Sequence, residues 1–293
     1  MQRRALGRDF GLSLRMTVAL VLLAATYAGL AAGCAFLILY RPSYAWLWAL
    51  SGIAVGASLA ARYRGGGDAV LRSLGAKVVT ADKEHAIHEI VERLAGLVDI
   101  APPRIAVADT AAPNALAVGL RQGRSTVVVT RGLIRLLDDR ELEAVIAHEI
   151  AHLVHRDAAV MTAVSAPRVL GEVIIGEAGS GRGLIWTMGW PLGLLPLGIG
   201  TALTLTVSRY REFSADRGSA LLTGAPEQLM SALEKIAGHA AQIPHDDLRV
   251  ANAFCIISTE TQRISLFSDH PPLEKRLAAL SAIAREMGRP VAA

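Results

Sequence analysis

The sequence predicts an α+β, mainly helical integral membrane protein, with four transmembrane helices and a cytoplasmic domain that carries a small β-sheet. Hydrophobic residues make up 52% of the 293 residues, and the mean hydropathy is +0.39. The apolar residues are concentrated in a few long stretches, between which lie segments with strand and helix patterns. This combination is typical of a chain that lies partly in a bilayer and partly in water.

Two apolar stretches predict a transmembrane hairpin within residues 1–64. Residues 16–40 carry no charge, and as a helix they extend about 37 Å at ~1.5 Å per residue, enough to span a hydrocarbon core of ~30 Å. Residues 43–61 form the second stretch, and tyrosines and tryptophans gather around the turn between the two. Arginines flank the hairpin on both sides, whereas its turn has only Arg41. The positive-inside rule therefore places the N-terminus and residue 62 onward in the cytoplasm.

Residues 65–157 predict a cytoplasmic sheet followed by a helix. Strand patterns occur in AKVVT, RIAVADT, NALAVG and STVVVT, and a helical stretch at about 81–97 lies between the first two. Further along, Asp138 followed by Glu141 indicates a capping box, after which apolar residues repeat at helical spacing. The polar motif HEIAHLVHRD at 148–157 is therefore expected on a capped helix.

Residues 158–207 predict a second transmembrane hairpin. Residues 183–207 are uncharged and long enough to span a bilayer, whereas 158–178 are interrupted by a proline and three charged residues. We expect the helix that carries HEIAHLVHRD to continue into this hairpin. Residues 208–293 form a second cytoplasmic part that is mainly helical, with helices expected near 226–240 and 272–287.

The spacing of His148 and His152 indicates a metal site. Residues four apart share one face of a helix, so both imidazoles can bind one metal ion. Glu149 is badly placed to be a third ligand on that face but is well placed to act as a general base. This is the H-E-x-x-H arrangement of zinc metalloproteases. With 8 histidines in the chain, chance alone produces the pattern in roughly one chain in a hundred, so incidental histidines on a surface helix are the alternative.

A catalytic zinc site also needs a third protein ligand. Ala158 stands where a metzincin has a histidine, which excludes that class. Glu172 and Glu212 are both candidates, and Glu212 is favoured because Asp216 follows it by four residues and can accept a hydrogen bond from a ligand histidine. If Glu212 binds the same ion as the two histidines, the segment 157–208 crosses the membrane an even number of times.

Four segments together resemble the HtpX group of membrane-bound zinc metalloproteases, which are related to the type I CAAX prenyl proteases. They are PNALAVG at 113–119, AVIAHEIAHLVHRD at 144–157, SRYREFSAD at 208–216 and HPPLEKRLAAL at 270–280. The resemblance implies a zincin-like endopeptidase of the bacterial cytoplasmic membrane that is linked to membrane-protein quality control and stress response. It also implies one Zn²⁺ per chain, held by His148, His152 and Glu212, with Glu149 as the catalytic base.

The resemblance implies further residues at the substrate cleft. Asn114 matches an asparagine on the strand beside the cleft, and His270 matches a histidine that approaches the substrate or the oxyanion. The alternatives are that Asn114 turns the chain after Pro113 and that HPP only begins the last helix. His155 lies seven residues from His148 on the same helix face and can compete for the metal.

Three functions are weighed against these observations. An active zinc endopeptidase accounts for the whole set of motifs, and it implies protein substrates and a lipid bilayer as surroundings. A CAAX-type prenyl-protein protease would need more spans, and a non-catalytic zinc-containing scaffold has no need of Glu149. The net charge of +4 with no nucleic-acid motif excludes a nucleic-acid partner and is attributed to the loops beside the membrane.

Overall fold

The computed structural model describes residues 10–40, 42–44, 69–119, 125–179, 184–240 and 270–289, with a few single positions between 46 and 60. The chain divides into two compact units. The sheet unit combines the described residues of Gly66–Ala158 with those of Arg209–Ala293. The helical unit combines Asp9–Gly65 with Ala159–Ser208.

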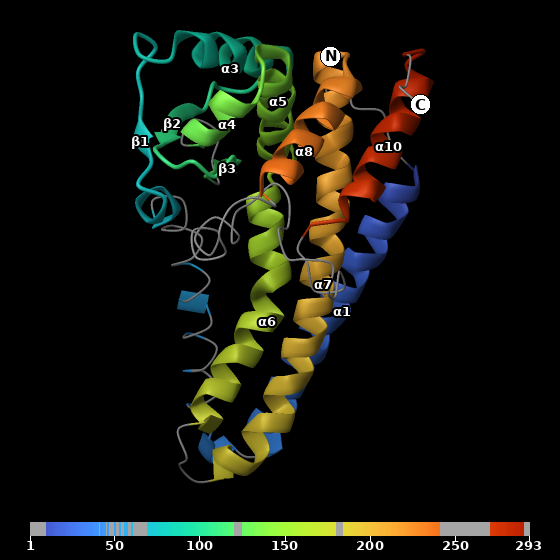
Figure 1. Cartoon of the computed structure of the whole chain (residues 1–293). Helices are drawn as coiled ribbons and strands as arrows, with labels where there is room; N and C mark the ends of the chain where they lie inside the picture. Colours follow the sequence, from blue (N-terminus) through green and yellow to red (C-terminus); the bar gives the residue numbers. More distant parts are fainter. Residues whose placement is uncertain are drawn as a thin grey trace. The chain divides into compact units, whose positions relative to one another are not determined.

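A four-stranded mixed sheet forms one layer of the sheet unit (Figure 1). Its strands lie in the order β1-β2-β4-β3, with β2 and β4 parallel and the other two pairs antiparallel. Each strand falls within one of the four segments that the sequence predicts as strands. Because β3 pairs with β4 alone among the described strands, it forms one edge of the sheet. The strands are β1 (Lys77–Val78), β2 (Arg104–Ala108), β3 (Ala115–Val118) and β4 (Thr126–Thr130).

Helices pack around this sheet and extend away from it. The capping box predicted at the start of α5 is present, because Asp138 accepts the backbone N–H of Glu141 and the Glu141 carboxylate accepts that of Asp138. The sequence analysis missed α4, in whose first turn the backbone N–H of Leu133 donates a hydrogen bond to the Thr130 hydroxyl at the end of β4. The helices of the sheet unit are α3 (His85–Leu97), α4 (Arg131–Leu136), α5 (Asp139–His155), α8 (Pro226–Ala240), α10 (Leu273–Glu286) and the last part of α7.

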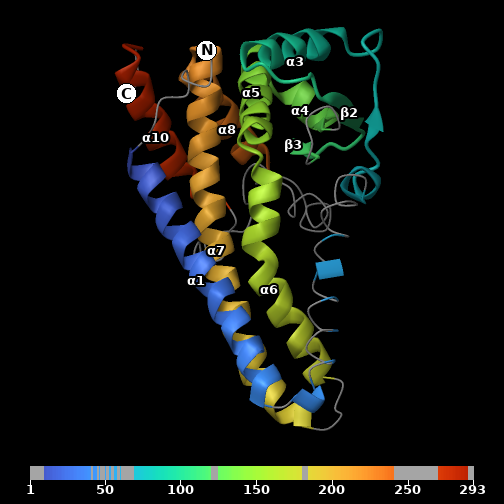
Figure 2. The ribbon, with the colours of Figure 1, turned by 180° about the vertical axis from the view of Figure 1, so that it is seen from behind.

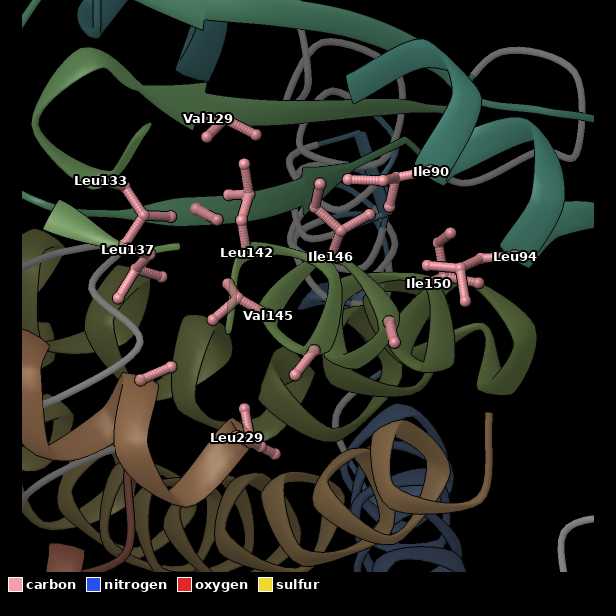
Figure 3. Close-up of a cluster of buried hydrophobic side chains, with 14 of the residues drawn as sticks. Ile90, Leu94, Val129, Leu133, Leu137, Leu142, Val145, Ile146, Ile150 and Leu229 are labelled. Carbon is pink, nitrogen blue, oxygen red and sulfur yellow. The ribbon is translucent and has the colours of Figure 1, made fainter. Parts of the chain in front are cut away.

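Helix α5 lies at the centre of the core, between the sheet with α3 on one side and α8 on the other (Figure 3). Leu142, Ile146 and Ile150 point toward the sheet and α3, and the last two are fully buried. Leu229 of α8 covers the opposite side of α5 and is also buried. Each such side chain contributes about 1.5–3 kcal/mol on burial, so α5 is held firmly on both sides.

The described residues of the helical unit contain three long helices: α1 (Phe10–Tyr40), α6 (Asp157–Gly179) and the first part of α7 (Leu184–Thr223) (Figure 2). Helices α6 and α7 approach at the level of their backbones. A Cβ at Gly200 would lie 2.2 Å from the backbone nitrogen of Arg168, and one at Gly171 would lie 2.5 Å from that of Leu197. Only glycine permits such an approach, which is a common feature of helix pairs in membranes.

The structure supports the membrane prediction in part. Within the described residues, one helical segment, Asp157–Gly176, is long and apolar enough to cross a bilayer, with a mean hydropathy of 1.5. A shorter apolar segment, Leu20–Gly33, lies in α1. The expected span at 43–61 lies largely outside the described residues.

The expectation that the HEIAHLVHRD helix continues into the second hairpin is wrong. Helix α5 ends at His155, and Arg156 follows with a φ of 55° and a ψ of 40° in the left-handed region. Its N–H bonds back to the carbonyl groups of His152 and Leu153, which closes α5. Helix α6 then begins at Asp157 as a separate helix, because one left-handed residue ends an α-helix.

Candidate metal centre

Helix α5 brings the two histidines of the motif together. His148 is 1% exposed and the side chain of His152 is 12% exposed. Their Nε2 atoms lie 3.1 Å apart, and the two rings are perpendicular with centroids separated by 4.7 Å. The i, i+4 spacing therefore aims both Nε2 atoms at one point, as the sequence pattern predicts.

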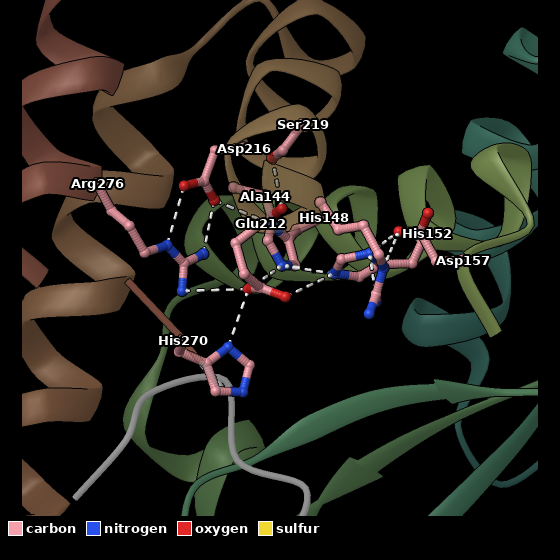
Figure 4. A network of polar contacts seen from close by, with 10 residues as sticks. Ala144, His148, His152, Asp157, Glu212, Asp216, Ser219, His270 and Arg276 are labelled. Atoms are coloured by element: carbon pink, nitrogen blue, oxygen red, sulfur yellow. Dashed lines mark hydrogen bonds and ion pairs between the residues drawn. The ribbon is translucent and has the colours of Figure 1, made fainter. Parts of the chain in front are cut away.

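Helix α7 supplies Glu212 to the same point (Figure 4). Its Oε2 atom lies 3.6 Å from Nε2 of His148, and its Oε1 atom lies 3.6 Å from Nε2 of His152. Glu212 itself is 3% exposed, and one ligand atom from each of the three residues lies within 4.8 Å of the others. The hydroxyl of Ser219, also on α7, donates to the Ala144 carbonyl at 2.6 Å and joins this helix to α5.

The other candidate for the third ligand, Glu172, has a different setting. It lies on α6, and its Oε1 atom accepts a hydrogen bond from Nε of Arg168 at 2.9 Å. Among the described residues, the group that can hold a metal ion contains Glu212 and not Glu172. The structure thus brings together the three residues that the sequence analysis favours.

Asp216 lies one turn after Glu212 on α7 and faces the first histidine. Its Oδ1 atom is 3.0 Å from Nδ1 of His148, on the ring edge away from Glu212. Arg276 of α10 holds this carboxylate with two hydrogen bonds, from Nε at 2.9 Å and from Nη2 at 2.6 Å. Asp216 is fully buried and Arg276 is 1% exposed.

The second histidine has a corresponding carboxylate, Asp157. Its Oδ2 atom is 2.5 Å from Nδ1 of His152 and 3.0 Å from Nε of Arg211. Sequence reasoning missed Asp157, Arg211 and Arg276 as parts of the site. For Arg276 a signal was present, because it occupies the apolar face of its helix with Leu280 and Ile283, where a lone arginine needs a buried partner.

The structure also places the remaining candidates. Glu149 is 3% exposed on α5 beside the two histidines, and Asn114 is 2% exposed just before the edge strand β3. Nδ1 of His270 lies 3.1 Å from Oε2 of Glu212, so this histidine reaches a proposed ligand directly. His155 is outside the three-residue group, and its Nδ1 atom lies 3.5 Å from the Ser214 hydroxyl.

The charges of the site shift several pKa values. Burial favours the neutral form of His148, but hydrogen bonds to Asp216 and Glu212 outweigh it and raise its pKa to about 9. Burial likewise opposes ionisation of Glu212, yet His270, His148 and His152 hold its pKa well below its usual range. Burial lowers the pKa of His155, which favours a neutral ring.

The residues present fit a divalent metal ion. Two imidazoles and one carboxylate are the donor set that zinc takes in catalytic sites with three protein ligands. Four carboxylates are buried around the position that the three ligand atoms face, and two guanidinium groups contact them. With both ligand imidazoles neutral, as metal binding requires, the carboxylates exceed the guanidinium groups by two charges. A divalent cation matches this excess in a region where an unbalanced charge is costly. The carboxylates are Glu149, Asp157, Glu212 and Asp216, and the guanidinium groups are Arg211 and Arg276.

Comparison with known proteins agrees with this geometry. The model of peptidase family M48 matches residues 81–284. A protease HtpX homolog of Moorella thermoacetica is 39% identical, over 97% of this chain and 98% of the relative. Protease HtpX homolog 2 of Methanosarcina mazei is 37% identical, over 97% and 99% of the two chains.

A likeness in fold extends to a solved structure. The crystal structure of S. mikatae Ste24p matches 92% of this chain with a TM-score of 0.53 and 21% identity, and this chain spans 66% of its length. The family match covers the metal-site residues on α5 and α7 and Arg276 of α10. His148, His152 and Glu212 form a group that could hold a metal ion, and the chain is a metallopeptidase that belongs to peptidase family M48.

Proposed function

We propose that the protein is a zinc-dependent endopeptidase of the bacterial cytoplasmic membrane, with its site on the cytoplasmic side, and that it degrades misfolded or surplus membrane proteins. The observation that carries the proposal is the group His148, His152 and Glu212 with Glu149 buried next to it. Zinc accepts this donor set, and a general base is needed for catalysis but not for a structural metal.

The roles follow from the positions of the side chains. The three ligands would hold one zinc ion, which when bound supplies a nucleophile at neutral pH and polarises the scissile carbonyl. Glu149 takes the proton of the attacking water and returns it to the leaving amine. His270 lies next to Glu212 and its side chain is 24% exposed, and we propose that it faces the substrate there.

The edge strand β3 supports a proposal for substrate binding. It packs against α5, and its far edge pairs with none of the described strands. An extended peptide can add to such an edge through main-chain hydrogen bonds, so that binding tolerates many sequences. Asn114 precedes this strand, and its own main chain is held by Thr130, to which it donates its N–H at 2.8 Å. The family resemblance places an asparagine beside the cleft at this position, and on that ground the side chain of Asn114 is proposed to contact the substrate.

The helical unit supports the membrane proposal. Large apolar side chains on α1 and α7 are exposed to the surroundings, among them Leu22, Phe36 and Leu195 at 53%, 64% and 67%. Such exposure is unfavourable in water and favourable in lipid. Glu212 follows the expected fourth span by five residues, and Asp157 directly precedes the third, so the site is proposed to lie near the membrane surface.

Proteolysis with a matched variant tests the enzymatic proposal. Detergent-solubilised full-length protein should contain about one zinc per chain and should cleave casein. Glu149→Gln should keep the zinc and lose the cleavage, because its ligands remain while the base is removed. Loss of zinc in this variant, or cleavage at the wild-type rate, would refute the role of Glu149. Cleavage confined to prenylated C-terminal peptides would favour the CAAX-type alternative.

Cysteine labelling in intact cells tests the orientation. In a background without Cys34 and Cys255, a cysteine at position 180 in place of serine should react with a membrane-impermeant thiol reagent. A cysteine in place of the exposed Ser73 should react only after the cells are permeabilised. Labelling of the Ser73 variant in intact cells would place the sheet unit outside the cytoplasm.

A further inference from the structure

Two parallel rows of side chains lie behind the metal-ligand group, one behind each histidine. In the first, Nδ1 of His148 meets Asp216, and Asp216 is held by Arg276 at 2.6 and 2.9 Å. In the second, Nδ1 of His152 meets Asp157, and Asp157 is held by Arg211 at 3.0 Å. The residues come from separate helices, so the repetition is not a result of one local motif.

We propose that Asp157, Arg211 and Arg276 are positioning residues, which complete two His–Asp–Arg relays that set the orientation of both histidines for the metal. The inference rests on the proposed function, because it assumes that the histidines bind a metal. It adds three residues that act through the ligands and not on the substrate.

The carboxylates determine which ring nitrogen is available for the metal. An aspartate beside Nδ1 accepts a hydrogen bond only if the proton is on that nitrogen, which leaves the lone pair on Nε2. The Nε2 atoms of His148 and His152 are 3.1 Å apart and each lies 3.6 Å from Glu212. The two relays therefore leave both lone pairs directed at the position that Glu212 also faces (Figure 4).

The guanidinium groups have a second effect, because they hold the aspartates in place. Arg276 donates two hydrogen bonds to Asp216, and its remaining nitrogen, Nη1, lies 3.7 Å from Oε2 of Glu212. One planar group thus contacts a relay aspartate and the third ligand at once. A lysine retains the positive charge but lacks the planar, forked guanidinium group, so it cannot contact Asp216 and Glu212 with the same geometry.

The second relay depends on the break between α5 and α6. In a continuous helix, residue 157 would lie about 140° around the axis from His152, on another face. The left-handed conformation of Arg156 turns the chain and brings the Asp157 carboxylate back to the His152 ring. Such a conformation is unfavourable for a residue with a Cβ, and unfavourable conformations of this kind gather at functional sites.

The alternative is that the arginines only join helices, without an effect on the metal. Two variants elsewhere provide matched controls. Glu286→Gln removes the ion pair between Arg217 and Glu286, which also joins α7 to α10 but does not touch the metal group. Lys235→Met removes the partner of Glu141 on α8 and tests a comparable loss of stability.

The experiment measures zinc affinity by competition with a chelator, in detergent-solubilised full-length protein. Asp157→Asn, Arg211→Gln and Arg276→Gln should each weaken zinc binding by about 10- to 100-fold, the usual effect of losing a group that orients a metal ligand. Arg276→Lys should fold better than Arg276→Gln but should still bind zinc less tightly than wild type. The visible spectrum of Co²⁺ in the site should change in the relay variants and stay unchanged in both controls.

The outcomes separate the inference from the proposed function. Wild-type zinc affinity and an unchanged Co²⁺ spectrum in folded Asp157→Asn and Arg276→Lys would overturn the relays while leaving the enzyme intact. If zinc binding weakens equally in the Glu286→Gln and Lys235→Met controls, the loss of affinity comes from lower protein stability, and the relays are overturned as well. A wild-type protein that binds no zinc would instead refute the proposed function itself.

Discussion

Replacing Glu212 by alanine should weaken zinc binding by more than about 100-fold, whereas Glu172→Ala should leave it unchanged. The two glutamates were the competing candidates for the third ligand in the sequence. The structure places Glu212 3.6 Å from both histidine Nε2 atoms and pairs Glu172 with Arg168 on α6. The two variants therefore give opposite results if the geometry determines the metal site.

The size of the effect follows from the number of ligands. Zinc bound by four protein ligands is worth about 10–16 kcal/mol, or roughly 3 kcal/mol for each ligand. Since ~1.4 kcal/mol is a factor of ten, the loss of Glu212 corresponds to somewhat more than 100-fold in the dissociation constant. The buried His270 contact is lost too, so Glu212→Gln, which keeps the shape of the side chain, should be measured beside the alanine variant.

Equilibrium titration against a zinc chelator of known affinity measures the change, with thermal unfolding of the metal-free proteins as a check of folding. Glu172→Ala is the matched control, because it removes the same functional group from a long helix. The reasoning is refuted if Glu172→Ala loses the metal while folded Glu212→Gln and Glu212→Ala retain wild-type affinity.

Three further predictions concern stability and substrate binding. Burial opposes ionisation of Glu141, but Lys235, Ser231 and the Asp138 backbone lower its pKa, so its stabilising effect is present above about pH 4.5 and is lost as the pH falls. Glu141→Gln should therefore cost about 1–2 kcal/mol of unfolding free energy at pH 7, a modest figure because Lys235 is partly exposed to solvent. The difference from wild type should shrink as the pH falls below about 4.5, and a difference that stays constant with pH contradicts the prediction. Gly200→Val should destabilise the protein by about 1–3 kcal/mol in thermal unfolding, because the valine side chain would collide with the α6 backbone. Gly198→Ala should not destabilise it, because there is open space around Gly198, and equal effects of the two variants would contradict the close approach of α6 and α7. Asn114→Ala should lower kcat/KM about tenfold, the effect of a lost hydrogen bond of ~1.4 kcal/mol, with zinc content unchanged; an unchanged kcat/KM would remove Asn114 from the site.

The features that the sequence predicted well are those that depend on neighbours along the chain. The four strand segments were recognised from their β-branched residues, and the start of α5 from Asp138 and Glu141, because strand alternation and helix capping are properties of short segments. The shared direction of His148 and His152 belongs to the same class, since it follows from the helical repeat alone. Helix α4 was missed because its cap, Thr130, is also the last residue of a strand.

The features that only the tertiary structure decided are contacts between segments far apart in the chain. The sequence favoured Glu212 over Glu172 because Asp216 follows it by four residues, but only the packing of α7 on α5 brings Glu212 to the histidines. Arg276 is 60 residues from Asp216, and no spacing rule relates them. Asp157 is near His152 in sequence, yet a continuous helix would separate the two. The left-handed conformation of Arg156 instead brings Asp157 to the His152 ring. Local propensity disfavours this conformation unless the surrounding packing and contacts hold it in place.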